Sequence, residues 1–224
     1  MNCCPSGACG GPEDAKTAST REFFSKEAAK YARRFERRGP DAAQRGMLKL
    51  LETDELEGRS VLDIGCGAGP MHVSLLVRGA GRAFGVDIAP AMIAQARRMA
   101  TQSGFGERVE YRDGDFVQLA AQIPTHQITV LDKVVCCYED IDAIVDRSVE
   151  KTEQTYVLSY PRAHVTLMMR LSSWLSKRLF GGFHPFVHDW GRLDQRILSH
   201  GFQRRRQANT LNWQIRLYGR LPVA

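Results

Sequence analysis

The stretch VLDIGCGAGP, residues 61–70, decides the fold of this chain. Its apolar residues before Gly65 are typical of a buried strand, and a carboxylate, Asp63, lies within them. Three alternate glycines follow, which let the backbone turn sharply and approach a ligand with no Cβ in the way. Pro70 suits the first turn of a helix. The stretch therefore predicts a strand, a ligand-binding glycine turn and a helix.

The spacing of the glycines separates two classes of cofactor. A dinucleotide fingerprint needs G-x-G-x-x-G, so that a pyrophosphate lies on the helix N-terminus. Here the third glycine, Gly69, comes one residue early, and Pro70 occupies the place of the fingerprint glycine. A nucleoside cofactor without a diphosphate is therefore predicted.

Two further apolar runs end in carboxylates. Residues 83–86 lead to Asp87, and residues 109–112 lead to Asp115 and Phe116. A carboxylate that ends the second strand of an α/β unit can accept hydrogen bonds from both ribose hydroxyls, which is the role predicted for Asp87. Taken singly, Asp87 and Asp115 are also typical helix caps or turn residues.

The motif DIGCGAG resembles the first motif of class I S-adenosylmethionine-dependent methyltransferases. The resemblance implies that Asp63 holds the methionine ammonium group and that the glycine turn passes under the nucleoside. It also implies that Ile88 and Met92 pack on the adenine, that Asp115 accepts from the adenine amine, and that Phe116 covers the base. The cofactor residues so expected are Asp63, Gly65, Cys66, Gly67, Gly69, Asp87, Ile88, Met92, Asp115, Phe116 and Leu131.

The alternation of strand-like and helix-like segments predicts an α/β fold with a doubly wound, mostly parallel seven-stranded sheet. Strands are expected at residues 60–64, 83–87, 109–112, 127–131, 155–159, 204–208 and 212–218, and helices at 22–38 and 41–51. The last two strands are too close for a crossover and should form an antiparallel hairpin. The family has the same plan, with a helical N-terminal extension.

Residues 161–188 form an insertion longer than a simple connection requires. Its apolar residues recur at helical spacing between Leu167 and Leu179. Three interpretations are open: a helix packed on the core, a lid over the substrate, or a helix resting on a lipid surface. His184 and His188 are four residues apart, but Pro185 between them favours a turn over a metal site.

The acceptor end should follow the fourth strand, at residues 130–138, where ligands of doubly wound sheets bind. Asp132 is a candidate base or substrate anchor, and Tyr31 is a second catalytic candidate because the N-terminal helix closes over the cofactor in the family. The chain also resembles the magnesium-protoporphyrin O-methyltransferase branch. That branch has a histidine shortly after the Leu-Asp pair, where this chain has Cys136 and Cys137, so a porphyrin acceptor is not predicted.

The net charge and the positions of the cysteines limit the predictions about partners and cellular location. The net charge of +6 fits solvated helix faces or an anionic small acceptor; no DNA contact is predicted, and RNA is disfavoured because the basic clusters lack interleaved aromatics. Residues 1–20 are expected to be a flexible leader with reduced thiols at Cys3, Cys4 and Cys9, ahead of a methyltransferase domain at 21–224. No signal peptide or membrane span is found, so a cytoplasmic location is expected.

The leading hypothesis is a methyltransferase that acts on a small molecule with S-adenosyl-L-methionine as cofactor and no metal. One alternative is a catalytically silent cofactor-binding protein whose cysteines sense metal or redox state. Another is an enzyme whose acceptor is itself a thiol or a metalloid, because Cys136 and Cys137 lie beside the expected methyl position. Peripheral membrane contact remains open.

Overall fold

The computed structural model describes residues 15–51, 56–169 and 185–222. The helices are α1 (Ala15–Arg38), α2 (Ala42–Leu51), α3 (Pro70–Val77), α4 (Pro90–Gln102), α5 (Phe116–Leu119), α6 (Ile141–Glu150) and α8 (Trp190–Ser199). The strands are β1 (Ser60–Ile64), β2 (Arg82–Asp87), β3 (Val109–Asp113), β4 (His126–Asp132), β5 (Thr152–Pro161), β6 (Phe202–Asn209) and β7 (Trp213–Arg220). Residues 163–169 are also helical.

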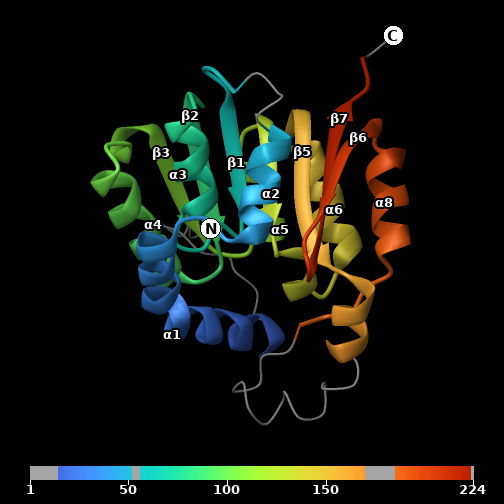
Figure 1. Cartoon of the computed structure of the whole chain (residues 1–224), viewed down its shortest axis with the longest axis horizontal. Helices are drawn as coiled ribbons and strands as arrows, with labels where there is room; N and C mark the ends of the chain where they lie inside the picture. The colour runs from blue at the N-terminus through green and yellow to red at the C-terminus, as the bar shows by residue number, and fades with distance from the viewer. Residues whose placement is uncertain (1–14, 52–55, 170–184, 223–224) are drawn as a thin grey trace, which may run out of the picture.

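The seven strands form one sheet in the order β3-β2-β1-β4-β5-β7-β6. Strands β1 to β5 are parallel, whereas β7 pairs antiparallel with both β5 and β6. This confirms the predicted doubly wound sheet with its C-terminal hairpin, and each predicted strand is present with ends shifted by at most three residues. Figure 1 shows the strands side by side between two layers of helices.

Residues along each strand alternate between the two faces of the sheet, and each face has its own core. Val61 packs on the face covered by α2, α3 and α4, whereas Leu62 and Ile64 pack on the face covered by α5, α6 and α8. Strand β1 is buried on both faces, as expected for the centre of a parallel sheet. Its glycine turn therefore projects from a rigid support.

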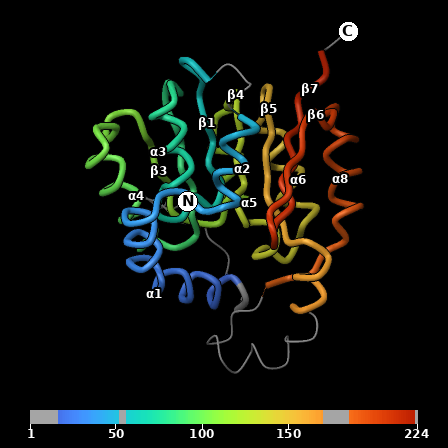
Figure 2. The backbone as a smooth tube through the Cα atoms, in the orientation of Figure 1, coloured from blue at the N-terminus to red at the C-terminus, as the bar shows by residue number. Residues whose placement is uncertain are grey.

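Helix α1 begins at Ala15 rather than at Glu22, so the last six residues of the predicted leader are helical. Cys3, Cys4 and Cys9 lie outside the described residues. Figures 1 and 2 show α1 lying across the end of the sheet where the parallel strands finish, and the orange helix of residues 163–169 lies at the same end. The N-terminal extension thus covers the edge where ligands of such sheets bind.

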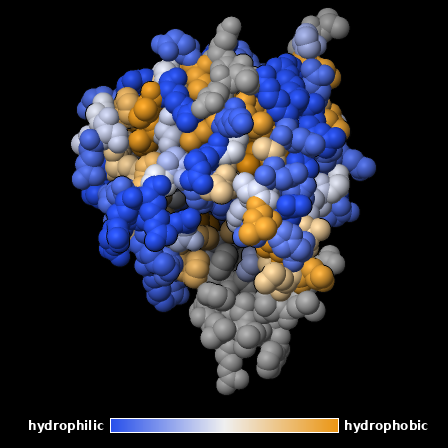
Figure 3. Space-filling model, in the orientation of Figure 1, coloured by the Kyte–Doolittle hydropathy of each residue, from blue (hydrophilic) through white to orange (hydrophobic). Residues whose placement is uncertain are grey.

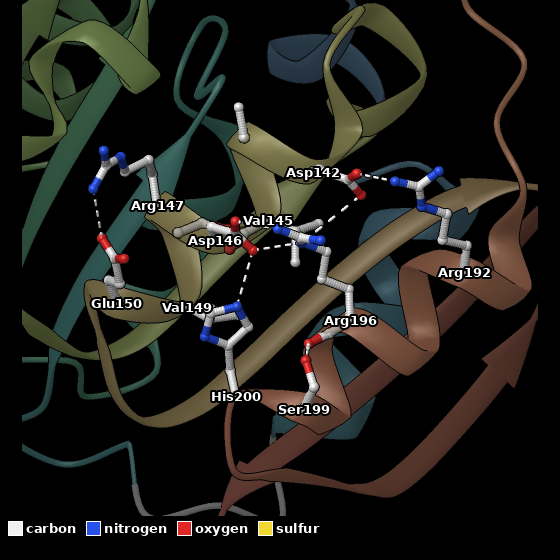
Figure 4. Close-up of polar contacts among 12 residues, drawn as sticks. Asp142, Val145, Asp146, Arg147, Val149, Glu150, Arg192, Arg196, Ser199 and His200 are labelled. Carbon is white, nitrogen blue, oxygen red and sulfur yellow. Dashed lines mark hydrogen bonds and ion pairs between the residues drawn. The ribbon is translucent and has the colours of Figure 1, made fainter.

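On the opposite side of the molecule, ion pairs join α6 to α8 (Figure 4). The guanidinium of Arg196 donates to both oxygens of Asp146 at 2.6 and 2.5 Å. His200 lies 2.9 Å from the same carboxylate, and Arg192 pairs with Asp142. Arg196 and then His200 hold the pKa of Asp146 below its ordinary value. The network fixes α8 against α6.

The surface seen in Figure 3 carries several separate apolar groups among hydrophilic side chains. Leu167 and Met168 of the insertion are both more than half exposed. Among the described residues, no helix has the length and apolar character needed to cross a membrane. The remaining predicted helix of the insertion, up to Leu179, lies outside the described residues.

Candidate active site

One cavity of about 1080 Å³ lies at the carboxyl ends of the parallel strands. Its walls come from the glycine turn, from the ends of β2 and β4, from α1, and from the described ends of the insertion, including Met169 and Phe186. A typical small-molecule cavity spans roughly 300–1,000 Å³. This one is therefore large enough to hold two small ligands side by side.

The glycine turn adopts the backbone that its residues predict. Gly65, Gly67 and Gly69 have φ angles of 64°, 54° and 92°, in the left-handed region that glycine adopts at no steric cost. A Cβ added to Gly67 would meet nothing within 4 Å, whereas one added to Gly65 would lie 2.5 Å from a methyl carbon of Val134. The turn is thus open to a ligand at Gly67 and closed by packing at Gly65.

Asp87 fastens this turn to the end of β2. Its carboxylate accepts a hydrogen bond from the Gly67 backbone N–H at 2.8 Å and one from the Ala89 N–H at 2.9 Å. Burial raises the pKa of Asp87 to about 6, against the lowering effect of these two N–H groups. Asp87 lines the cavity and therefore presents a carboxylate that ionises near neutral pH.

Asp63 is buried beneath the turn and paired with a residue that sequence reasoning missed. The Nδ1 atom of His72 lies 2.8 Å from its carboxylate, and the His72 backbone N–H donates to the same oxygen at 3.3 Å. The other ring nitrogen of His72 lies 2.8 Å from the Tyr111 hydroxyl, which donates to the Ala96 carbonyl at 3.0 Å. A buried polar chain thus runs from Asp63 to α4.

The third carboxylate, Asp115, combines two of the roles considered for it. It caps α5 by accepting from the Val117 N–H at 2.8 Å, and it accepts from the Tyr138 hydroxyl at 3.0 Å. Burial, followed by the charge of Asp115, raises the pKa of Tyr138 above its ordinary value. Tyr138, the last residue of the predicted acceptor segment, thus connects the β3 end of the cavity to the segment after β4.

Beside these carboxylates, Ile88, Met92 and Phe116 contribute apolar walls to the cavity. Met92 and Phe116 are almost fully buried, at 2% and 5% exposed. Cys66 also lines the cavity, and burial followed by the charges of Asp63 and Asp87 raises the pKa of its thiol. The predicted residues at the ends of β1, β2 and β3 therefore surround one space.

Two predicted cofactor residues do not line this cavity. Leu131 is fully buried in the core on the α6 face of the sheet, because side chains alternate along β4 and only its end reaches the cavity. Gly69 begins α3 and lies over His72, with which an added Cβ would collide at 2.9 Å. Its role here is to allow close packing.

Asp132, the first catalytic candidate, accepts hydrogen bonds at both of its carboxylate oxygens. One oxygen accepts from the Ser159 hydroxyl at 2.8 Å, and the other accepts from the Gln44 amide at 3.0 Å and from the Lys133 ammonium at 3.3 Å. Lys133 also donates to Asp41 at 2.6 Å. Burial acts to lower the pKa of Lys133, but Asp132 and Asp41 outweigh it and raise the pKa. The cluster places an ammonium on the cavity wall.

Lys133 adopts a left-handed backbone, with a φ of 61°, which is uncommon for any residue other than glycine. The backbone N–H of Lys133 donates to Ser159 Oγ at 2.9 Å. This turn directs the chain into the short helix η3 (Val135–Cys137), whose two cysteines line the cavity. Such strained positions occur preferentially at functional sites.

Tyr31, the second catalytic candidate, lies on α1 and lines the same cavity, with 43% of its surface exposed. Burial of the ring, followed by the charge of nearby Cys137, raises the pKa of the hydroxyl. The end of the insertion lies close by, since the Phe186 N–H donates to the Cys136 carbonyl at 2.7 Å. His188 contacts the Tyr138 carbonyl at 2.9 Å, so it holds this loop, and His184 lies outside the described residues.

Comparison with known proteins relates part of the chain to methyltransferases. Residues 61–154 match the family described as a methyltransferase domain. The ribosomal protein L11 methyltransferase of Pectobacterium carotovorum is 41% identical over 63 residues, which are 28% of this chain and 21% of that protein. The chain thus spans about a fifth of the length of the curated relatives it matches.

Solved structures share the fold over most of the chain. Magnesium protoporphyrin IX methyltransferase from Synechocystis PCC 6803, with bound S-adenosylhomocysteine, superposes with a TM-score of 0.72 and 21% identity, covering 92% of this chain and all of that one. An S-adenosylmethionine-dependent methyltransferase from Mesorhizobium loti gives a TM-score of 0.62 at 16% identity, covering 80% of this chain and 99% of that one. Residues 61–154 thus match a methyltransferase domain, and the chain has the fold of class I S-adenosylmethionine-dependent methyltransferases.

Proposed function

We propose that this protein transfers a methyl group from S-adenosyl-L-methionine to a small-molecule acceptor. The observation that carries the proposal is the single cavity, which joins the three carboxylates of the glycine-turn end to the Lys133 ammonium and Tyr31 at the other end. A methyl donor and its acceptor need this arrangement, because holding the nucleophile in line with the methyl carbon supplies much of the rate.

In the proposed arrangement the cofactor occupies the end beside Gly67 and Asp87. Gly67 leaves space for the nucleoside, and the ionised carboxylate of Asp87 accepts from the ribose hydroxyls while it continues to fix the turn. Phe116 and Met92 provide the apolar surface on which the adenine packs. Asp115 is proposed to accept a hydrogen bond from the adenine amine in addition to the one that it accepts from the Tyr138 hydroxyl.

The acceptor is proposed to occupy the compartment bounded by Tyr31, Lys133, Cys137, Met169 and Phe186. Lys133 donates two hydrogen bonds to carboxylates of the described residues, and an ammonium group has three N–H donors. The third is suited to bind an anionic group of the acceptor. Asp132 is then proposed to hold Lys133 in place. Both of its carboxylate oxygens already accept hydrogen bonds from neighbouring side chains, so we do not assign it the role of general base.

The reaction is an in-line displacement in which the acceptor's lone pair attacks the methyl carbon and the sulfonium–carbon bond breaks. A carboxylate acceptor needs no base, whereas a hydroxyl must lose its proton. The raised pKa of Tyr31 makes its phenol a hydrogen-bond partner of the acceptor and a poor base at neutral pH. An acceptor whose nucleophile needs no deprotonation, such as a carboxylate bound to Lys133, is therefore the one we propose.

The described ends of the 161–188 insertion are proposed to cover the acceptor compartment. Met169 and Phe186 lie in the cavity wall, and His188 contacts the loop that carries Cys136 and Cys137. We further propose a reducing, cytoplasmic setting, which the separate thiols of Cys66, Cys136 and Cys137 support.

The proposal is tested by incubating the protein with methyl-labelled S-adenosylmethionine and a fractionated metabolite extract. Label should appear in one small-molecule fraction. Lys133→Met should raise KM for that acceptor at least tenfold, because it removes the ammonium and keeps the stem, while binding of S-adenosylhomocysteine stays within twofold. Cofactor binding without label transfer to any fraction would favour the silent cofactor-binding protein instead.

A further inference from the structure

Two adjacent cysteines direct their thiols to the same point in the acceptor compartment. The Cys136 and Cys137 thiols each donate to the Lys133 carbonyl at 3.4 Å, and the two sulfur atoms lie 3.8 Å apart. Both residues line the cavity, and Cys137 is partly exposed to it. The methyl transfer proposed above assigns no role to this pair.

The separation of the two sulfurs fits a single bridging atom. It is longer than a disulfide bond of about 2.05 Å, so the thiols are separate. Two bonds of about 2.3 Å, the length of a zinc–sulfur bond, span up to about 4.6 Å through one shared atom. A centre that binds both sulfurs at an angle therefore needs only a small adjustment of the side chains.

The number of ligands excludes the usual metal sites. Structural zinc requires four protein ligands, and the described residues contain no group of three or more histidine, cysteine or acidic side chains placed to hold a metal ion. A centre that is complete with two sulfurs and a hydroxyl of its own has no such requirement. Trivalent arsenic, which is three-coordinate and bonds strongly to sulfur, is a centre of this kind.

The protonation state of the Cys137 thiol points the same way. The hydrogen bond to Cys136, followed by burial, holds the pKa of Cys137 well above its ordinary value. A divalent metal ion binds thiolates and would have to displace the proton of Cys137. A trivalent arsenic hydroxide instead condenses with neutral thiols, so no charge is created in the cavity.

We propose that Cys136 and Cys137 form a chelating site for a trivalent arsenical inside the acceptor compartment. Two arsenic–sulfur bonds form and two arsenic–oxygen bonds break, and the two thiol protons leave with the hydroxides as two water molecules. Arsenic stays trivalent, so no oxidant or reductant is consumed. The site needs neither cofactor nor methyl transfer, so it stands or falls independently of the proposed function.

Calorimetric titration of the full-length protein with sodium arsenite tests the proposal. The starting variant carries Cys3→Ser, Cys4→Ser and Cys9→Ser, which leaves Cys66, Cys136 and Cys137. One arsenic should bind per chain, and Cys136→Ser or Cys137→Ser should each weaken binding by about 10²- to 10⁴-fold, because chelation becomes a single bond. Cys66→Ser is the matched control and should leave the arsenite affinity within twofold.

A second measurement uses the unaltered chain, so that it does not depend on the folding of variants. Native protein is alkylated with and without arsenite, and tryptic peptides are analysed by mass spectrometry. Cys136 and Cys137 share the peptide 134–147, while Cys66 lies in 60–78 and the other three lie in 1–16. Arsenite should protect peptide 134–147 alone. Protection confined to peptide 1–16, arsenite binding unchanged in Cys137→Ser, or tighter binding of zinc than of arsenite would each overturn the proposal.

Discussion

The affinity for the cofactor should fall as the pH drops below 6, because of Asp87. Burial raises the pKa of this carboxyl from 3.8 to about 6. Only the ionised form can accept hydrogen bonds from both ribose hydroxyls while it holds the N–H groups of Gly67 and Ala89. If the ligand binds only that form, the apparent Kd for S-adenosylhomocysteine doubles at pH 6 and rises about tenfold at pH 5 relative to pH 8.

The stability of the ligand-free protein should change in the opposite direction. The pKa of Asp87 is higher in the folded chain than in the unfolded chain, so the folded chain binds the extra proton between pH 6 and 3.8. Ionised Asp87 therefore costs the folded state about 3 kcal/mol above pH 6, and this cost disappears as the pH falls. A lower pH should therefore remove the cost of ionised Asp87 to the stability of the ligand-free protein and lower the affinity for the ligand.

Isothermal titration calorimetry with S-adenosylhomocysteine at pH 5, 6, 7 and 8 measures this effect. The control is Asp87→Asn, which has nearly the same shape and does not ionise. Subtracting its pH profile removes the titration of the ligand and of every other group. We expect the variant to bind at least tenfold more weakly at pH 8, with the gap closing toward pH 5. Parallel profiles for the two proteins would refute the assignment of Asp87 to the ribose.

Three other residues give sharp tests. Gly67→Ala and the control Gly104→Ala place a Cβ on left-handed backbone with open space around it, so each should cost about 1–2 kcal/mol of stability. Only Gly67→Ala should also lower the affinity for S-adenosylhomocysteine by tenfold or more. Equal affinities of the two variants would show that no ligand lies over the turn. Tyr111→Phe leaves His72 and the Ala96 carbonyl without the hydroxyl that they contact, so it should lower the free energy of unfolding in urea by about 1–3 kcal/mol. An unchanged free energy would mean that water replaces the hydroxyl. Asp146→Ala should lower the urea midpoint more than Glu150→Ala. Because the pKa of Asp146 is lowered in the folded state, its contribution to stability should be lost as the pH falls through that pKa. A difference between the two variants that persists at pH 2 would contradict the ion-pair account.

The sequence predicted the cofactor end of the site because its signals are local. The turn at Gly65 to Gly69 and the position of Asp87 at a strand end depend on residues within a few positions of one another, and the family match covers the same region, 61–154. Strand alternation also predicted the sheet and its hairpin. The side chain of Leu131 lies in the core and not in the cavity wall, because its direction depends on the pairing of β4 with β1 and β5.

The acceptor end was only partly predictable, because tertiary contacts build it. Gln44 and Asp41 reach Asp132 and Lys133 across about 90 positions of sequence, and no periodicity marks such a pair. His72 carries no local signal either, since it lies inside the apolar helix α3. Tyr138 ends the predicted acceptor segment, but nothing near it in the sequence indicates its contact with Asp115. Asp115 shows the same limit, because its role as helix cap was predictable and its bond to Tyr138 was not.

Gly65 lies where the cofactor end of the cavity meets the acceptor end, and its packing suggests how the acceptor end can vary while the cofactor end stays the same. Its missing Cβ lets Val134 approach the cofactor turn, and Val134 begins the segment that carries Cys136 and Cys137. Val134 therefore packs closely against the glycine turn. In the described part of the chain, Cys136 and Cys137 form hydrogen bonds with Lys133, Val134 and Phe186. Because the Asp87 carboxylate fastens Gly67 from the end of β2, we expect substitutions beyond Val134 to leave the proposed cofactor site in place. A chain with cysteines in this loop can thus keep the family's cofactor site and accept a different substrate.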